Sequence, residues 1–277
     1  MDADAIKTMR LYSQVERVYD DLRHAGIGDD DPLTVDALSA FDQYHYFGTE
    51  AVDEAIGALN IGPHSRVLDV GSGLGGPARV MATHSGCQVT ALELQADLDQ
   101  VGKSLTARCG LAGNVDHVCG DVLETALAPG GHDAVVSWLA LYHITDPARL
   151  FARLADAVTP GGGLYVEDFH RLGDFTDQEQ TVLDQVLYAQ SVPLRDEYIT
   201  TVEAAGFTDV RFTDMTAPWT EFVSERAAAY RARLDEHAAV HGADVAGGLD
   251  TFYQAVVKLF RGGRFAGVRL TATKQQE

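Results

Sequence analysis

A short segment, residues 67–76, constrains the fold more than any other part of this sequence. It reads VLDVGSGLGG, in which a strand-like start is followed by Gly71, Gly73 and Gly76 in a G-x-G-x-x-G spacing. This spacing lets a buried strand turn tightly into a helix while its backbone approaches a ligand closely. Pro77 follows at once and suits the first turn of that helix. The segment predicts a strand, a tight turn and a helix, with a ligand at the turn.

Strand-like and helix-like segments alternate along the chain after this point. β-branched runs predict strands at 66–70, 88–93, 114–118, 133–137 and 163–169, and amphipathic stretches predict helices at 78–85, 97–109 and 147–158. The last two strands are expected at 208–215 and 265–273. Strands separated by helices predict an α/β fold with a doubly wound, mostly parallel, seven-stranded Rossmann-like sheet.

The chain is expected to form one main domain with helical additions. Its 277 residues, of which 46% are hydrophobic, are enough for one large core. Residues 1–50 predict an N-terminal helical cap, broken by a Gly/Asp/Pro cluster at 26–32 before a second helix near Val35. The core is expected at 51–277, with a helical insertion at about 220–259 that is a candidate lid. Residues 274–277 are expected to be a free tail.

Composition and charge limit the classes of molecule that this chain is expected to bind. With 41 acidic and 21 basic residues the formal charge is −20, which repels nucleic acid and anionic lipid and favours a small-molecule partner. No apolar run approaches a membrane span, and the first residues lack an export signal, so a cytoplasmic location is expected. Cys87, Cys109 and Cys119 lack metal-ligand spacing and are interpreted as buried thiols, with no metal site. A homodimer is compatible with these features.

Acidic residues near the glycine turn decide which ligand fits it. Asp69 stands at the strand end and Asp121 is expected close by, and both would oppose the pyrophosphate of a dinucleotide. S-adenosylmethionine carries a sulfonium and an ammonium against one carboxylate, so the same acids would attract it. Glu93 closes the next strand, where a carboxylate can accept hydrogen bonds from ribose hydroxyls. Nicotinamide-dependent enzymes also carry an acidic residue at the end of the next strand, so Glu93 alone does not distinguish the two ligands.

Four motifs in order resemble the class I S-adenosylmethionine-dependent methyltransferases: VLDVGSGLGG, the ALELQ around Glu93, Gly120-Asp121-Val122, and the PGGG at 160–163. The resemblance covers residues 66–169. GLGGPAR and the late helical insertion are similar to small-molecule members such as phosphoethanolamine, tocopherol and sterol methyltransferases. The nearest type is identified as the sarcosine/dimethylglycine N-methyltransferases.

The resemblance implies a cofactor site. Asp69 and Gly71 would hold the methionine moiety, Glu93 the ribose, and Asp121 with Val122 the adenine edge. The full set is Asp69, Gly71, Gly73, Gly76, Glu93, Leu94, Asp121, Val122 and Trp138. Alternatives remain open, because Gly73 and Gly76 could serve only the turn, and Asp121 could be a plain loop acid or helix cap.

His143 is the candidate catalytic residue. It follows the fourth predicted strand in SWLALYHITD, at the sheet edge where open α/β proteins bind their ligands. A histidine near neutral pKa could remove the proton that an amine or hydroxyl loses on methylation, and it could also contact the substrate. The alternative is that His143 anchors the loop before Asp146-Pro147.

Further candidates for the substrate pocket lie outside the main motif. Tyr44, His45 and Tyr46 belong to an aromatic segment that ends at Gly48, and aromatic faces attract ammonium and sulfonium groups. Arg195 could grip a substrate carboxylate, with Tyr198 close by. The alternatives are that the aromatic residues fill core and that Arg195 forms a surface salt bridge.

These observations favour methyl transfer from S-adenosylmethionine to a small molecule, with the amine nitrogen of an amino acid or small amine as the first choice. An O- or C-methyltransferase of a natural-product precursor is the alternative. A nicotinamide-dependent oxidoreductase is a remote alternative, because Asp69 opposes a pyrophosphate. A protein that binds the cofactor without catalysis is a third class, for which the sequence gives no sign.

Overall fold

The structure is a computed structural model that describes residues 8–276. The helices and strands along the chain are α2 Arg17–His24, α3 Val35–Asp42, α4 Gly48–Ala58, β1 Arg66–Val70, α5 Gly76–Ser85, β2 Gln88–Glu93, α6 Ala96–Arg108, β3 Val115–Cys119, β4 His132–Trp138, η1 Leu141–His143, α7 Pro147–Ala157, β5 Val158–Arg171, α8 Asp177–Val182, η2 Leu183–Leu187, α9 Arg195–Ala204, β6 Phe207–Asp214, α10 Thr216–Ala232, α11 Leu234–His241, α12 Ala243–Arg261 and β7 Phe265–Lys274.

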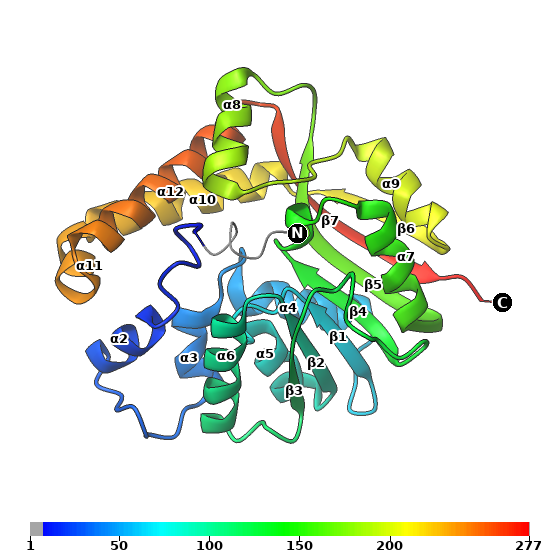
Figure 1. Cartoon of the computed structure of the whole chain (residues 1–277), viewed down its shortest axis with the longest axis horizontal. Coiled ribbons are helices and arrows are strands. Elements are labelled where there is room, and N and C mark those ends of the chain that lie inside the picture. Colours follow the sequence, from blue (N-terminus) through cyan, green and yellow to red (C-terminus); the bar gives the residue numbers. More distant parts are fainter. Residues whose placement is uncertain (1–7, 277) are drawn as a thin grey trace.

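One sheet of seven strands forms the centre of the molecule, in the order β3-β2-β1-β4-β5-β7-β6. The pairs from β3 to β5 are parallel, whereas β7 runs antiparallel to both β5 and β6. The chain order reverses between β1 and β4, and the carboxyl ends of these strands face the same edge (Figure 1). In such sheets the crevice beyond a reversal of strand order is the usual ligand site.

Helices cover both faces of the sheet because successive strand residues point to opposite sides. Leu68 of β1 faces the core that contains Phe151 of α7. Its neighbour Val67 faces the other core, which contains Met81 of α5. All four side chains are almost completely buried, and each large apolar side chain contributes about 1.5–3 kcal/mol to folding. Because both faces of β1 are buried in these two cores, its position is fixed, and so is that of the glycine turn that follows it.

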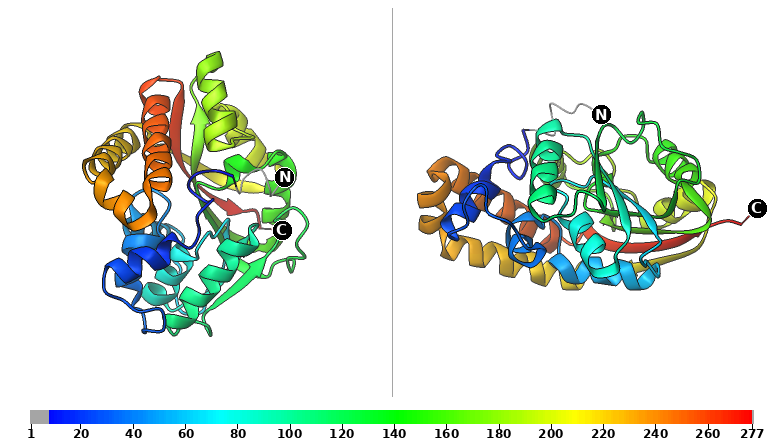
Figure 2. Two further views of the ribbon diagram at one scale, coloured as in Figure 1. Left: turned by 60° about the vertical axis from the view of Figure 1, so that its left-hand side comes forward. Right: turned by 90° about the horizontal axis from the view of Figure 1, so that it is seen from below.

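The late helical insertion and the N-terminal helices lie next to each other beyond one end of the sheet. Figure 1 shows α10, α11 and α12 as a layer across that end, and both views in Figure 2 keep them beside the N-terminal helices. Contacts between α2 and α11 connect the two parts. Trp219 of α10 is fully buried in a third core, with Tyr46 and Phe169. These elements therefore roof the crevice at the strand ends.

The predicted fold class is confirmed, and several boundaries change. The stretch expected at 220–259 consists of three helices that run from Thr216 to Arg261. β5 begins at Val158, so the glycines at 161–163 lie inside the strand, and Lys274 belongs to β7 instead of a free tail. The domain boundary expected at residue 50 falls inside α4.

Of the three cysteines predicted to be buried, Cys87 is buried, but Cys119 is exposed at the end of β3, so that expectation was wrong there. Over residues 8–276, no helix is long and apolar enough to cross a membrane. In the same part of the chain, no group of three or more His, Cys, Asp or Glu side chains could hold a metal ion.

Candidate functional site

The glycine turn wraps over the end of β2. The backbone N–H groups of Gly71 and Ser72 donate to the Leu92 carbonyl at 2.9 and 3.1 Å. Gly71 has φ +73°, and a Cβ at this position would clash with the Cβ of Ala140. Any larger residue would therefore need both a strained backbone and a displaced neighbour. The turn has the shape that the G-x-G-x-x-G spacing predicts.

Glu93, at the end of β2, is held beneath this turn. Its two carboxylate oxygens accept hydrogen bonds from the backbone N–H groups of Gly73 and Gln95, both at 2.9 Å. Burial raises the pKa of Glu93 to about 7, although these two N–H groups act to lower it. The carboxylate is therefore fixed in position, and part of its population is protonated at neutral pH.

Asp69 is a second buried carboxyl group at the same edge. It is 1% exposed at the end of β1, and within the described residues its Oδ2 has no hydrogen-bond partner. Burial raises the pKa of Asp69 to about 8, and the nearby Glu93 charge adds to this effect. Two acids in one buried region are costly to ionise without a cation. A positively charged ligand would relieve this cost.

A buried ion pair holds the back of the turn to α3. Arg79 of α5 is fully buried and donates to Asp42 Oδ2 at 2.7 Å and to the Leu74 carbonyl at 2.6 Å. Burial raises the pKa of Asp42, but the adjacent guanidinium opposes that shift. Gly76 begins α5 here, and a Cβ on it would lie 2.6 Å from the Asp42 carbonyl oxygen. This contact fixes where α3 ends relative to the turn.

Two cavities meet at the turn. The first, called the loop cavity, has a volume of about 630 Å³ and lies beyond β1 and β2. The structure brings six of the nine predicted cofactor residues to it. Its lining is Tyr12, Val70, Gly71, Gly73, Leu92, Glu93, Leu94, Gln95, Leu98, Gly120, Asp121, Val122, Ala140, Leu141, His143 and Ile144.

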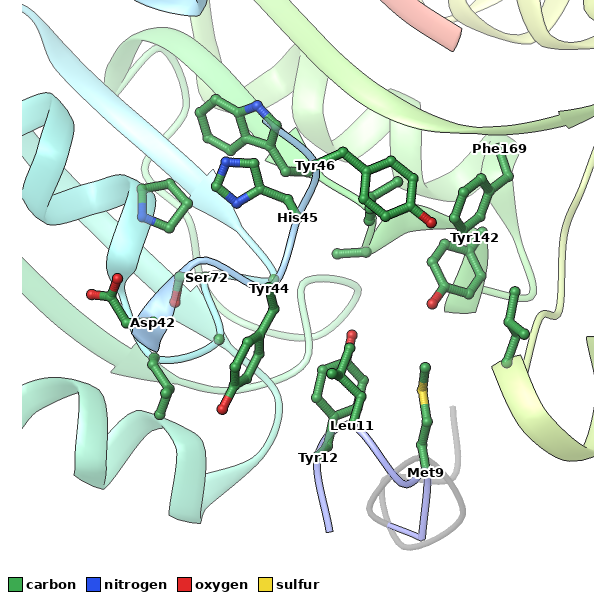
Figure 3. Close-up of a pocket in the computed structure, with 18 of the residues that line it drawn as sticks. Met9, Leu11, Tyr12, Asp42, Tyr44, His45, Tyr46, Ser72, Tyr142 and Phe169 are labelled. Carbon is green, nitrogen blue, oxygen red and sulfur yellow. The ribbon is translucent and has the colours of Figure 1, made fainter. Parts of the chain in front are cut away.

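The second, called the aromatic cavity, has a volume of about 730 Å³ and lies beneath the helical roof. In Figure 3, Met9 and Tyr12 of the N-terminal segment face Tyr142 and Phe169 across it. Its lining is Met9, Leu11, Tyr12, Asp42, Tyr44, His45, Tyr46, Asp69, Gly71, Ser72, Gly73, Leu74, Pro77, Trp138, Leu139, Ala140, Tyr142, Phe169, Leu187, Arg226, Phe252 and Val256. The two cavities share Tyr12, Gly71, Gly73 and Ala140.

Tyr44, His45 and Tyr46 all line the aromatic cavity, as the sequence predicts. The His45 Nε2–H donates to the Gly48 carbonyl at 2.9 Å, and burial lowers the pKa of His45 to about 4. Burial raises the pKa of Tyr46 to about 12. These side chains are therefore uncharged at neutral pH and give the cavity an aromatic wall with few charges.

The other three predicted cofactor residues lie outside the loop cavity. Asp69 borders the aromatic cavity, next to the shared glycines, instead of the loop cavity. Trp138 was expected beside the adenine, but it lines the aromatic cavity with its ring centroid 5.6 Å from that of His45. Gly76 lines neither cavity, because it packs against the end of α3. The order of residues along a loop did not reveal on which side of the turn each side chain points.

His143 lies in the loop cavity and not in the aromatic cavity. Its Nδ1–H donates to the Tyr188 carbonyl at 3.0 Å, and within the described residues its Nε2 has no partner. Burial lowers the pKa of His143 to about 4, so the ring is neutral at pH 7. Tyr188 itself has a left-handed backbone with φ +52°. This geometry supports the anchoring alternative more than proton removal.

Arg195 and Tyr198, which were predicted as substrate contacts, line neither the loop cavity nor the aromatic cavity. Tyr198 is buried in the core under α7 and α9, and its hydroxyl donates to Asp168 Oδ2 at 3.4 Å. The Arg195 guanidinium stands 5.3 Å from the ring centroid of Phe212 in β6. Helix α9 packs against β5, β6 and α7, and this position keeps both side chains out of the two cavities.

Several lining residues were not predicted. Gln95 and Tyr142 adjoin predicted residues, so a wider window around each motif would have found them. Phe169 ends a predicted strand at the same sheet edge. Tyr12 and Arg226 come from the cap and the insertion, where no motif marks the side that faces the sheet. Only tertiary packing brings them to the site.

The comparisons with known proteins come from sequence and from structure. A family model described as "Methyltransferase domain" matches residues 68–166, which confirms the resemblance that the motifs predict. Three curated relatives are similar to this chain. Methyltransferase GfsG of Streptomyces halstedii is 24% identical over 67% of this chain and 66% of its own length. Sterol 24-C-methyltransferase ERG6B of Gibberella zeae is 31% identical over 61% and 50%. Glycine/sarcosine/dimethylglycine N-methyltransferase of Actinopolyspora halophila is 25% identical over 60% and 29%.

The chain therefore spans less than two thirds of the length of each of these relatives. Their names include both N- and C-methyltransferases, so they do not determine an acceptor atom. Among solved structures, phosphoethanolamine N-methyltransferase 2 of Haemonchus contortus has a TM-score of 0.75 at 22% identity, over 82% of this chain and 53% of that one. This likeness supports the seven-stranded Rossmann-like fold.

Proposed function

Because residues 68–166 form a methyltransferase domain, we propose that this chain transfers a methyl group from S-adenosylmethionine to a small-molecule acceptor. The observation that carries the proposal is the pair of buried carboxyl groups, Asp69 and Glu93, beside a glycine turn at the strand ends. A cationic adenosyl donor satisfies both acids, whereas a dinucleotide pyrophosphate would place more negative charge beside them.

The loop cavity is proposed as the donor site. Glu93 is fixed by two backbone N–H groups, which leaves its remaining lone pairs free to accept hydrogen bonds from ribose hydroxyls. Leu94 and Val122 offer apolar contacts to the adenine, with Asp121 at its edge. Asp69 borders the shared glycines and would receive the ammonium group. The bound donor supplies an electrophilic methyl group.

The aromatic cavity is proposed as the acceptor site, because it joins the loop cavity at Gly71, Gly73, Ala140 and Tyr12. An in-line displacement requires the acceptor atom about 3–3.5 Å from the methyl group, on the side opposite the sulfur. Two adjoining cavities, each holding one reactant, would allow this geometry. The aromatic walls and the roof would exclude water from the reacting atoms.

We propose that His143 positions the site and does not act as the general base. A base works best when its pKa is near the working pH, and the pKa of His143 is about 4. Its ring lines the donor side and ties η1 to Tyr188 through a 3.0 Å hydrogen bond. An acceptor that arrives with a free lone pair, such as a neutral amine, would need little help from a base.

The amine nitrogen of an amino acid or small amine remains the first proposal for the acceptor. The aromatic walls formed by Tyr44, Tyr46 and Trp138 suit an amine that becomes cationic on methylation. The similarity to a glycine/sarcosine/dimethylglycine N-methyltransferase points the same way. Methylation of an oxygen or carbon atom would be detected in the same test.

The test incubates the purified protein with methyl-labelled S-adenosylmethionine and a panel of amines, amino acids, phenols and other small metabolites, read by mass spectrometry. Labelled product is expected with at least one acceptor, and Asp69→Asn is expected to weaken donor binding in calorimetry. Asp53→Asn, an exposed acid of α4, is the matched control. Absence of donor binding together with binding of NADH would refute the proposal.

A further inference from the structure

Arg226 is the basic side chain that lines the aromatic cavity. It comes from α10, in the helical insertion, and its guanidinium carbon stands 4.9 Å from the ring centroid of Tyr46 and 4.9 Å from that of Tyr253. Phe222 lies 5.4 Å away on the same helix. These rings fix the guanidinium at the cavity wall, since each aromatic face attracts a cation.

Arg226 has no carboxylate partner among the described residues, whereas neighbouring arginines do have one. Arg231 of the same helix pairs with Asp250 at 2.7 Å, and Arg233 pairs with Glu236 at 2.7 Å. Among residues 8–276 no ion pair forms at Arg226, and its buried Nε has no hydrogen-bond partner, although the Tyr46 hydroxyl lies close enough to interact with the guanidinium. A buried donor on a charged group is costly to leave unsatisfied. Within this part of the chain, the charge of Arg226 is therefore not balanced by a carboxylate.

The aromatic cavity also carries two acids, and their roles differ. Asp42 is already paired with Arg79 at 2.7 Å. Asp69 lies by the shared glycines, where the proposed donor places its ammonium group. The cavity thus has one acid, Asp69, assigned to the donor, and one cation, Arg226, without a carboxylate partner. An acceptor with its own anionic group would complete this arrangement of charges.

We propose that Arg226 binds a carboxylate or another anionic oxygen group of the methyl acceptor, which therefore belongs to the class of organic acids with an apolar or aromatic body. The inference rests on the proposed function. It assigns to Arg226 the role that the sequence suggested for Arg195, whose side chain lies over Phe212 instead. A planar guanidinium suits this role because it can donate two parallel hydrogen bonds to one carboxylate.

A further cavity extends the site past Arg226. This outer cavity lies between the N-terminal helices and α10–α12, and Arg226 belongs to its wall as well as to that of the aromatic cavity. Arg17, Tyr230 and His237 also line it. An acid longer than the aromatic cavity could therefore keep its anionic group at Arg226 and place further atoms in the outer cavity.

The test uses pairs of probes that differ in charge but hardly in shape: benzoate with benzamide, and phenylacetate with phenylacetamide. Binding is measured by calorimetry and by ligand-detected NMR on the full chain saturated with S-adenosylhomocysteine. We expect at least one acid to bind about tenfold or more tightly than its amide, as a charge-assisted hydrogen bond implies. Arg226→Gln should bring the ratio close to one, and Arg226→Lys should keep part of it.

Arg231→Gln, on the same helix but paired with Asp250, is the matched control and should keep the wild-type ratio. Equal binding of acid and amide by the wild type, or no binding of any probe, would overturn the role of Arg226. So would an Arg226→Gln variant that keeps the preference. The comparison of acid and amide binding by the wild-type protein tests the proposal even if the variants fail to fold. Failure of the proposed function is distinct, because S-adenosylhomocysteine itself would then not bind.

Discussion

Donor binding should release protons, and the two buried acids set how many. The pKa values of Asp69 and Glu93 are about 8 and about 7, raised mainly by burial. At pH 6.5, below both values, each group is mostly protonated in the ligand-free protein. A cation stabilises the ionised form of both, so binding of S-adenosylmethionine should release more than one proton at this pH.

The release is measured by calorimetry in buffers of different ionisation enthalpy but equal pH. Asp69→Asn should leave only the Glu93 contribution, which is less than one proton, and should weaken binding. Asp53→Asn, at an exposed acid, should match the wild type. A wild-type release close to zero, or a release unchanged in Asp69→Asn, would refute the reasoning that these acids receive the donor's charge.

The same pKa values determine whether folding stability rises or falls with pH. Both acids have folded-state pKa values above their ordinary values of about 4, so their contribution to stability is complete below that pH. It is lost as pH rises through about 7 and about 8. Since the donor favours the ionised forms, the rise in Tm that it causes should be larger at pH 8 than at pH 6.

Three further substitutions follow from the site. Gly71→Ala should abolish donor binding in calorimetry, because the added Cβ meets Ala140, whereas Gly57→Ala, which meets nothing within 4 Å, should not. Arg79→Met should lower the free energy of unfolding in urea by about 3–5 kcal/mol, because it strands the buried Asp42; a loss below about 1 kcal/mol would contradict this. His143→Ala should reduce donor affinity and turnover together; lost turnover with normal affinity would restore its role as the base.

Much of the fold was predictable because its signals are local. The turn at Gly71 requires a positive φ and a missing Cβ, and both requirements are visible in the sequence as glycine. Glu93 and Asp121 end or follow strands, so parallel pairing brings them to one edge without further information. These residues were found because their place depends on strand order alone.

The acceptor side was not predictable in the same way. Arg195 and Arg226 both lie on helices without a motif, and the sequence does not state which side of the sheet each helix covers. Helix α9 packs against α7 on one face, and α10 packs against α12 over the strand ends. The same residue type therefore becomes a surface cation at one position and a cavity wall at the other.

Backbone strain is concentrated beside the aromatic cavity, which gives independent support to the proposal that the acceptor binds there. Among residues 8–276, five residues other than glycine have positive φ, and three of them, Phe47, Leu139 and Tyr188, pack against the core beside this cavity. Of the other two, Asn60 is a residue type that tolerates this conformation, and Asp209 lies at a register shift between β6 and β7. Left-handed backbone at bulky residues costs about 1–3 kcal/mol each and persists only where surrounding packing holds it. Leu139 lines this cavity itself, and Phe47 and Tyr188 pack against the core beside it, so surrounding packing must hold the strained backbone in place there.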